Sequence, residues 1–322
     1  MKITPLESRW SAVHRRFSNN PERFHSVDGS VETWSREITR PDDLPTDCAG
    51  LVDASFEAFP YCVRTPALRY QDRAEPESFL MLEGETLMVL KRVGDALTVF
   101  RCEVGALDAL ATETSLLQSR ITFYPRDGKP VSVPFNSVVE DLFAPVVAAY
   151  LRARGTSAEE SAQLGSVRPD PLEDLRARDH KYHAYANEVL PGDVARSRFY
   201  HPTEAVPALL NRSRLIPSYL LVGSASMLYV LSGKQPYRSR NGSDYSLMVR
   251  YLPISPDSSI GYRAIPGESR HRMMTLRAGT ATFELPLARS AEAEFAAFAQ
   301  TVQLPVLPVG AAGLSFEDQK VG

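Results

Sequence analysis

The sequence lacks the short motifs that would assign a chemistry directly. It has no glycine-rich phosphate-binding loop, no GxSxG nucleophile motif and no CxxC pair, and each of these has a defined spacing. Its three cysteines, Cys48, Cys62 and Cys102, are an odd number, so neither a disulfide scaffold nor a zinc site is indicated. We therefore predict a cytoplasmic protein without a cofactor, in which Cys62 and Cys102 are core thiols.

A surplus of basic charge and a long hydrophobic run are also lacking. Lysine and arginine number 36 against 39 acidic residues, a net charge of −3, whereas nucleic-acid binding needs a basic surplus. The most apolar stretch, residues 217–231, is too short for a membrane-spanning helix and contains Ser224 and Ser226. We expect it to form a buried pair of strands. Residues 1–17 lack the apolar core of a secretory signal.

What the sequence does contain is an internal repeat. Three segments of the first half recur in the same order in the second half: 78–90 at 218–231, 97–104 at 247–254, and 119–135 at 271–287. Within the third pair Arg120 aligns with Arg272, and Phe143 follows at the same offset as Phe295. Agreement in order, spacing and hydrophobic pattern indicates a duplicated domain.

Each copy is predicted to consist of strands followed by one helix. In the first copy, runs rich in Val, Ile, Phe and Tyr are separated by turns that contain glycine, such as Asp127-Gly128, which is typical of hairpins. Apolar residues at spacings of three and four then predict a helix from Val138 to Leu151, capped by Asn136 or Ser137 and kinked at Pro145. Residues 291–302 are the expected counterpart in the second copy.

This pattern resembles the pleckstrin-homology-like (PH-like) fold. Residues 188–202, EVLPGDVARSRFYHP, resemble the start of bacterial PH-like domains. Residues 59–67, 115–125 and 133–143 resemble an uncharacterised group of bacterial proteins, and this likeness covers most of the first copy. The resemblance implies an α+β, mainly β protein of two antiparallel sandwiches or partly open barrels, each closed by a C-terminal helix. It favours a binding or scaffolding role over catalysis, although a fold does not determine a function.

The expected organisation has five parts: an N-terminal helical extension (1–55), a first PH-like domain (56–153), a linker with a connecting helix (154–187), a second PH-like domain (188–304) and a flexible tail (305–322). Within the extension we predict short helices over 31–38 and 48–59. The connecting helix is expected within 172–190, where apolar residues recur on one face.

The strongest candidate for a binding site is basic. Lys234, Tyr237, Arg238 and Arg240 lie in one polar loop, and Arg270 and Arg272 form a second, smaller cluster. In PH domains that bind lipid headgroups, a basic loop between early strands holds the phosphates. A solvated loop is the simpler interpretation, because the basic density is modest and Asp244 and Glu268 offset it. The repeated Arg120 and Arg272 are interpreted as architectural, each paired with an acidic residue on the neighbouring strand, rather than as part of a site that both copies share.

His180 and His183 are a weak metal-site candidate. Their HxxH spacing places both imidazoles one helical turn apart, next to Asp179, but a zinc site needs a further ligand. A solvated helix face is favoured. His201 is interpreted as structural, and no pair of carboxylates has a spacing that indicates acid–base catalysis.

Three functional hypotheses follow. The leading one is a non-catalytic interaction or scaffold protein whose tandem PH-like modules bind a protein partner. The alternative is peripheral association with an anionic membrane surface through the basic loop 234–240. The third is an enzyme of unrecognised type with a site between the modules. The oligomeric state is left open.

Overall fold

The computed structural model describes residues 34–70, 73–115, 118–155, 172–190, 195–206, 214–234, 238–239 and 246–307. These residues are mainly β, in several antiparallel sheets that do not close into a barrel within the described ranges. The chain divides into two compact units. Unit 1 comprises residues 1–101, 117–119 and 133–145, and unit 2 comprises 102–116, 120–132 and 146–322.

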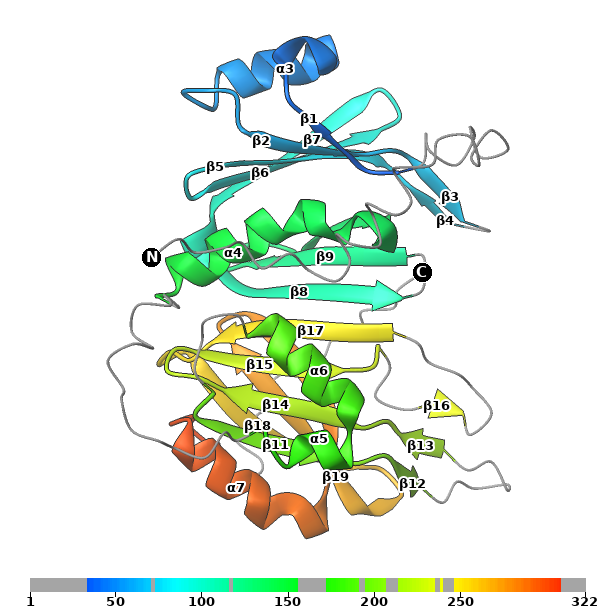
Figure 1. Cartoon of the computed structure of the whole chain (residues 1–322), viewed down its shortest axis with the longest axis vertical. Coiled ribbons are helices and arrows are strands. Elements are labelled where there is room, and N and C mark those ends of the chain that lie inside the picture. Colours follow the sequence, from blue (N-terminus) through cyan, green and yellow to red (C-terminus); the bar gives the residue numbers. More distant parts are fainter. Residues whose placement is uncertain are drawn as a thin grey trace. The chain divides into compact units, whose positions relative to one another are not determined.

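Unit 1 contains a five-stranded sheet in the order β1-β2-β5-β6-β7. The strands are β1 (Arg36–Ile38), β2 (Tyr61–Thr65), β5 (Glu77–Glu83), β6 (Thr86–Val93) and β7 (Ala96–Glu103). A short hairpin, β3 (Leu68–Tyr70) and β4 (Arg73–Glu75), follows β2. Helix α3 (Thr46–Asp53) covers one face of the sheet (Figure 1).

Successive side chains of β5 and β6 point to opposite faces of the sheet, and the apolar side chains on one face pack against α3. Cys48 and Val52 of the helix pack with Cys62, Phe79 and Met81 of the sheet. Ion pairs fix the helix over this core. The Arg92 guanidinium lies 2.8 Å from Asp47 Oδ1 and 3.3 Å from Glu77 Oε2.

Unit 2 contains most of a seven-stranded sheet in the order β10-β9-β8-β17-β15-β14-β11, and a three-stranded sheet, β18-β19-β20. The bounds are β8 (Leu107–Ser115), β9 (Gln118–Pro125), β10 (Val131–Asn136), β11 (Ser197–His201), β14 (Tyr219–Gly223), β15 (Met227–Ser232), β17 (Ser246–Pro253), β18 (Ser258–Ile265), β19 (Glu268–Ala278) and β20 (Ala281–Ala288). A small third sheet joins β12 (Glu204–Val206), β13 (Arg214–Ile216) and β16 (Arg238–Ser239).

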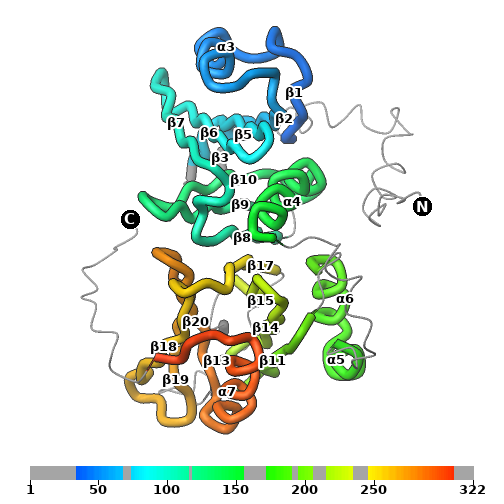
Figure 2. Tube along the Cα trace, turned by 90° about the vertical axis from the view of Figure 1, so that its left-hand side faces the viewer, coloured from blue at the N-terminus to red at the C-terminus, as the bar shows by residue number. Residues whose placement is uncertain are grey.

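Among its described residues, unit 2 contains the helices α4 (Ala144–Ala153, most of its length), α5 (Leu175–Arg178), α6 (His180–Val189) and α7 (Glu292–Thr301). Helix α6 and the strands β18–β20 lie on opposite faces of the β17-β15-β14-β11 sheet (Figure 2). The core between the sheets contains Phe199, Leu221, Val230, Phe295 and Phe298. The expected buried strand pair within 217–231 is confirmed as β14 and β15, with every residue of both strands buried.

The order of elements repeats along the chain. The first series is β2, β5, β6, β7, β8, β9, β10 and α4, and the second is β11, β14, β15, β17, β18, β19, β20 and α7. Both series have a small hairpin inserted after the first strand, β3–β4 in one and β12–β13 in the other, and the second series also has the short strand β16 between β15 and β17. The repeat noticed in the sequence therefore corresponds to a repeated succession of seven strands and one helix. The domain boundaries remain a prediction.

Strands of the two series pair with each other inside unit 2. β8, the fifth strand of the first series, lies antiparallel to β17, the fourth strand of the second, in a register of six residue pairs from Ser115↔Ser246 to Leu110↔Tyr251. Near the start of β8, the buried Asp108 carboxylate accepts hydrogen bonds from the Thr280 N–H (2.7 Å) and Thr280 Oγ1 (3.0 Å). These two bonds join β8 to the β19–β20 turn. The backbone pairing described above joins β8 to β17.

The turn between β9 and β10, the cap at Asn136 and the position of α7 agree with the sequence-based expectations. Gly128 has φ +124° in the turn between β9 and β10, the left-handed region that favours glycine. The Asn136 side chain accepts a hydrogen bond from the Val138 N–H, as predicted for the helix cap. In the second series, α7 buries Phe295 and Phe298 on one face.

Two helix predictions are wrong. Residues 36–38 form strand β1 rather than part of a helix, because their backbone pairs with β2 from Arg36↔Arg64 to Ile38↔Cys62; residues 31–33 lie outside the described ranges. The helix expected over 48–59 is present as α3, but it begins and ends earlier.

The second wrong prediction is the kink at Pro145. Helix α4 begins only at Ala144, so Pro145 occupies its first turn, where proline is tolerated. The break lies at Val139, inside the preceding 3-10 helix Ser137–Phe143.

The connecting helix also differs from expectation. Asp179 has extended backbone angles and divides the connecting segment into α5 and α6, because its carboxylate caps α6 by accepting from the Lys181 and Tyr182 N–H groups. The first residues of the expected flexible tail make backbone contacts with β18. The Leu307 N–H donates to the Ile260 carbonyl and Val306 bridges Ile260; residues 308–322 are not described.

Asp108→Ala is expected to lower the free energy of unfolding by about 2–3 kcal/mol, because it removes the buried carboxylate that accepts two hydrogen bonds from Thr280. Gly279→Ala should also destabilise, since Gly279 has φ +54° and a Cβ there would collide with the Asp108 carboxylate. Urea denaturation checks both. Asp127→Ala, at an exposed turn, is the matched control, and equal stability of the Asp108 and Asp127 variants would contradict the role of Asp108.

Candidate functional site

The predicted basic loop is only partly within the described ranges. Lys234 follows β15; its Nζ lies 2.7 Å from Glu113 Oε1 and its N–H donates to Ser246 Oγ. Arg238 belongs to β16, opposite Leu215 of β13. Tyr237 and Arg240 lie outside the described residues. The one loop side chain whose contacts are known is therefore already paired with a carboxylate.

The second basic cluster does not join the first into a described site. Arg270 is exposed, and its N–H donates to Glu268 Oε1. Arg272 Nε lies 3.3 Å from Glu292 Oε1, which connects β19 to the first turn of α7. Arg272 is thus paired with an acidic residue, but that residue lies on a helix and not on the neighbouring strand, where the architectural interpretation expected it.

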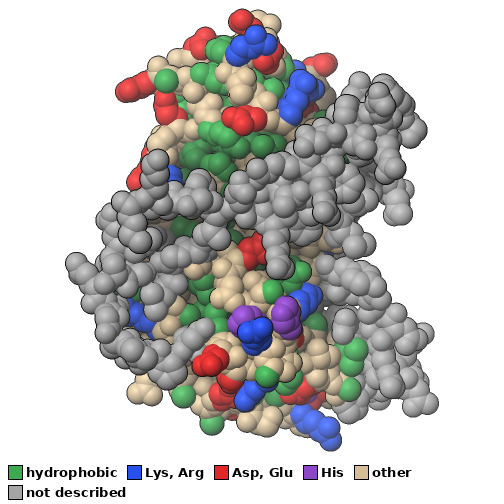
Figure 3. All heavy atoms as spheres, in the orientation of Figure 1, with side chains coloured by type: hydrophobic (Ala, Val, Ile, Leu, Met, Phe, Trp, Pro, Cys, Tyr) green, Lys and Arg blue, Asp and Glu red, His purple; other side chains and the backbone are tan. Residues whose placement is uncertain are grey.

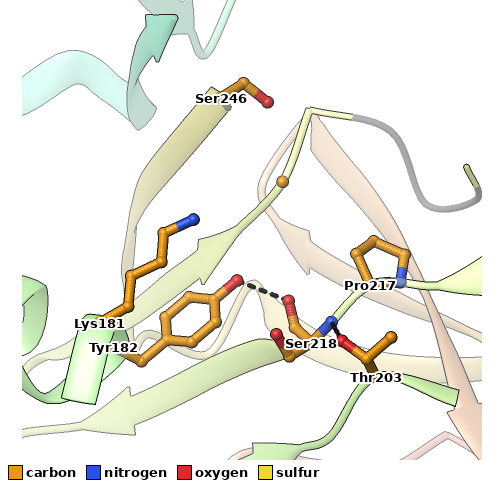
Figure 4. A pocket seen from close by; sticks show the side chains of 7 residues that line it. Lys181, Tyr182, Thr203, Pro217, Ser218 and Ser246 are labelled. Atoms are coloured by element: carbon orange, nitrogen blue, oxygen red, sulfur yellow. Dashed lines mark hydrogen bonds between the residues drawn. The ribbon is translucent and has the colours of Figure 1, made fainter. Parts of the chain in front are cut away.

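A small cavity lies where α6 meets the strand ends of unit 2 (Figure 4). Its volume is about 130 Å³, and its lining includes Lys181, Tyr182, Thr203, Ser218 and Ser246. The Tyr182 hydroxyl donates to the Ser218 carbonyl (2.5 Å), and the Ser218 N–H donates to Thr203 Oγ1 (3.1 Å). This volume is well below the roughly 300 Å³ at which pockets for drug-sized ligands begin.

Arg250 is the least expected polar side chain in the core of unit 2. It lies in the middle of β17 with 8% of its surface exposed. Its Nη1 donates to Ser232 Oγ (2.7 Å), its guanidinium lies 5.2 Å from the Phe283 ring centroid, and its Nε has no hydrogen-bond partner. Burial lowers the pKa of Arg250 to about 10, against the opposing influence of Tyr124 and Glu113. The side chain therefore stays charged at neutral pH in a mainly apolar setting.

A second buried polar cluster contains two histidines and two carboxylates. His271 Nε2 lies 2.9 Å from Glu204 Oε2, and His271 Nδ1 lies 3.5 Å from Glu268 Oε1. His201 is fully buried and stacks on Tyr219, with ring centroids 4.8 Å apart. Its Nδ1 lies 2.8 Å from the Pro202 carbonyl, and its Nε2 accepts from the Ala288 N–H. Both ring nitrogens are thus used as in a neutral imidazole, and burial lowers the pKa of His201.

His180 and His183 lie at the surface of α6, with ring centroids 6.4 Å apart. Figure 3 shows histidine and basic side chains next to each other on the face of unit 2 that it draws. Asp179, the nearby carboxylate, is occupied by the cap of α6 and by the Tyr200 hydroxyl (2.9 Å). Within the described ranges no three His, Cys, Asp or Glu side chains are grouped so that they could hold a metal ion.

Two of the cysteines, Cys48 and Cys62, are buried, and Cys102 is half-buried. Burial raises the pKa of Cys62 to about 12 and that of Cys102 to about 11. Both thiols therefore stay protonated at neutral pH, whereas a nucleophilic cysteine needs a lowered pKa.

Comparison with protein-family profiles and with curated proteins gave no match to this chain. None of the described helices is both long enough and apolar enough to cross a membrane. Sequence reasoning missed Arg250 and the contacts of Asp108. The signal for Arg250 was a single charge inside the apolar run LMVRYLP.

We expect Arg250→Met to raise the free energy of unfolding by about 1 kcal/mol, since a buried charge without a carboxylate partner costs more desolvation than its contacts return. Chemical denaturation measures this. Arg263→Met, at an exposed ion pair with Glu284, is the control and should change stability little. A marked loss of stability in Arg250→Met would show that the guanidinium contacts outweigh the desolvation.

His201 should make the stability of unit 2 depend on pH. Because the pKa of His201 is lowered from 6.5 in the folded protein, the unfolded chain binds the proton more readily. Its contribution to stability is therefore complete above pH 6.5 and is lost as the pH falls below that value. The pKa of Glu268 is also lowered, but from 4.5, so its effect appears at lower pH. Denaturation between pH 5 and 7.5 should show a slope that His201→Phe reduces and His180→Phe does not.

Proposed function

We propose that this chain is a non-catalytic interaction or scaffold protein built from two PH-like modules, and that it binds a protein partner. The repeated succession of seven strands and a terminal helix supports this proposal, as does the resemblance of the sequence to PH-like domains. In such modules the sheet edges and the groove beside the helix accept peptide strands or helices of other proteins.

The observation that carries the proposal is the pairing of β8 with β17. β17 is the fourth strand of its series, and its edge accepts a strand from the other series in an antiparallel register of six residue pairs. This fold therefore takes up an additional strand at that position, and main-chain hydrogen bonds supply much of the affinity in strand addition. Two linked modules would add avidity where both engage one partner.

Association with an anionic surface is the second candidate. The exposed Arg270 and the basic residues of the 234–240 loop favour it. The pairing of Lys234 with Glu113 reduces the free positive charge at the start of this loop. We therefore rank it below protein binding.

The test is affinity capture with the tagged full chain from its own cells, quantified by mass spectrometry, beside flotation with phosphatidylserine vesicles at about 50 and 200 mM salt. A protein partner recovered at constant stoichiometry, with no vesicle binding, is the expected result. Salt-sensitive vesicle binding lost in Arg238→Glu/Arg240→Glu but kept in Arg176→Glu/Arg178→Glu would replace protein binding by headgroup binding. Absence of both kinds of binding would overturn the proposal.

A further inference from the structure

β7 is the outermost strand of the sheet in unit 1. The order β1-β2-β5-β6-β7 places β6 on one side of it and, among the described residues, no strand on the other. An unpaired strand edge carries a row of backbone donors and acceptors that can pair with another chain.

β7 occupies the position in the first series that β17 occupies in the second. Both are fourth strands, and their sequences, LTVFRCEV and LMVRYLPI, align in the repeat. The edge of β17 is covered by β8. The chain thus shows at one of two equivalent positions what kind of element covers the edge: an antiparallel strand.

The surface at β7 is apolar in its first half. Val99 is 52% exposed, and Val93, at the tip of the same hairpin, is 58% exposed. Natural edge strands are commonly protected by lysine or proline, and β7 contains neither. Its two charges, Arg101 and Glu103, lie at its C-terminal end.

Side-chain contacts also connect β7 to β6 and to the chain after α3. Thr98 Oγ1 donates to the Lys91 carbonyl (3.2 Å) across the hairpin. Arg101 Nη2 donates to the Ser55 carbonyl (2.9 Å), and its guanidinium lies 6.0 Å from the Phe56 ring centroid. An incoming strand would meet a preformed edge, so the entropic cost of ordering β7 would not reduce its affinity.

We propose that the edge of β7 is the docking strand for the protein partner, which adds an extended, antiparallel segment to the sheet of unit 1. The β8–β17 register gives the chemistry of that segment. Thr112 lies opposite Val249 and Leu110 opposite Tyr251; Val99 and Arg101 are the aligned positions of β7. The partner segment therefore carries a small or β-branched residue opposite Val99 and an apolar residue two positions before it, opposite Arg101. This inference rests on the proposed function and names the partner's binding element.

The test uses the nine-residue peptide of residues 107–115, LDALATETS, labelled with a fluorophore and titrated with the full chain. Fluorescence anisotropy should show saturable binding, which Val99→Lys weakens at least about fivefold, the equivalent of one strong cross-strand pair. Val138→Lys, at another exposed valine of unit 1 outside the strands, is the matched control and should bind as the wild type does. A peptide with proline in place of Ala109 and Ala111 should not bind.

Hydrogen exchange of the complex locates the peptide. Slower exchange across 96–103 supports the proposal, whereas slower exchange across 246–253 alone would show displacement of β8 and would overturn it. No binding, or equal binding by the two lysine variants, would also overturn it. The two proposals can fail separately. If wild type and Val99→Lys capture a partner equally, the docking role of β7 is wrong but the scaffold function stands. If the peptide binds and no partner is captured, the strand-binding edge stands but the scaffold function is wrong.

Discussion

The antiparallel pairing of β8 with β17 is the contact on which the organisation of unit 2 depends. It brings Leu110 beside Tyr251, residues from different copies of the repeat, into one sheet. Asp108 then connects the start of β8 to the β19–β20 turn through Thr280. The close approach at Gly279 requires a residue without a Cβ. Local hairpins build each sheet, but these long-range bonds decide which strands become neighbours and which edges stay uncovered.

The polar groups inside unit 2 are held by different means. Arg250 has a hydroxyl and an aromatic ring but no carboxylate within ion-pair distance among the described residues. His201 is satisfied as a neutral imidazole by two backbone groups, and His271 lies between two carboxylates. Such groups cost free energy to bury unless they are paired.

Much of the local structure could be predicted because its causes are local. The Asp127-Gly128 turn follows from the backbone freedom of glycine, and the Asn136 cap follows from one side-chain oxygen near a free N–H. The errors arose where distant segments intervene. Residues 36–38 have a sequence compatible with a helix but gain hydrogen bonds as a strand beside β2. The break at Asp179 results from a cap that also accepts the Tyr200 hydroxyl, 21 residues further along the chain.

The sequence by itself determined the repeat, the succession of strands and terminal helix, and the burial of residues 217–231, because period, turn chemistry and hydrophobic alternation are properties of short segments. Only the tertiary structure decided that Lys234 pairs with Glu113, that Arg272 pairs with Glu292, and that among the described strands β17 is covered while β7 is an edge. These outcomes depend on pairing between residues far apart in the chain. Such pairing is selected by the packing and hydrogen bonding of whole sheets, for which no short stretch of sequence carries a signal.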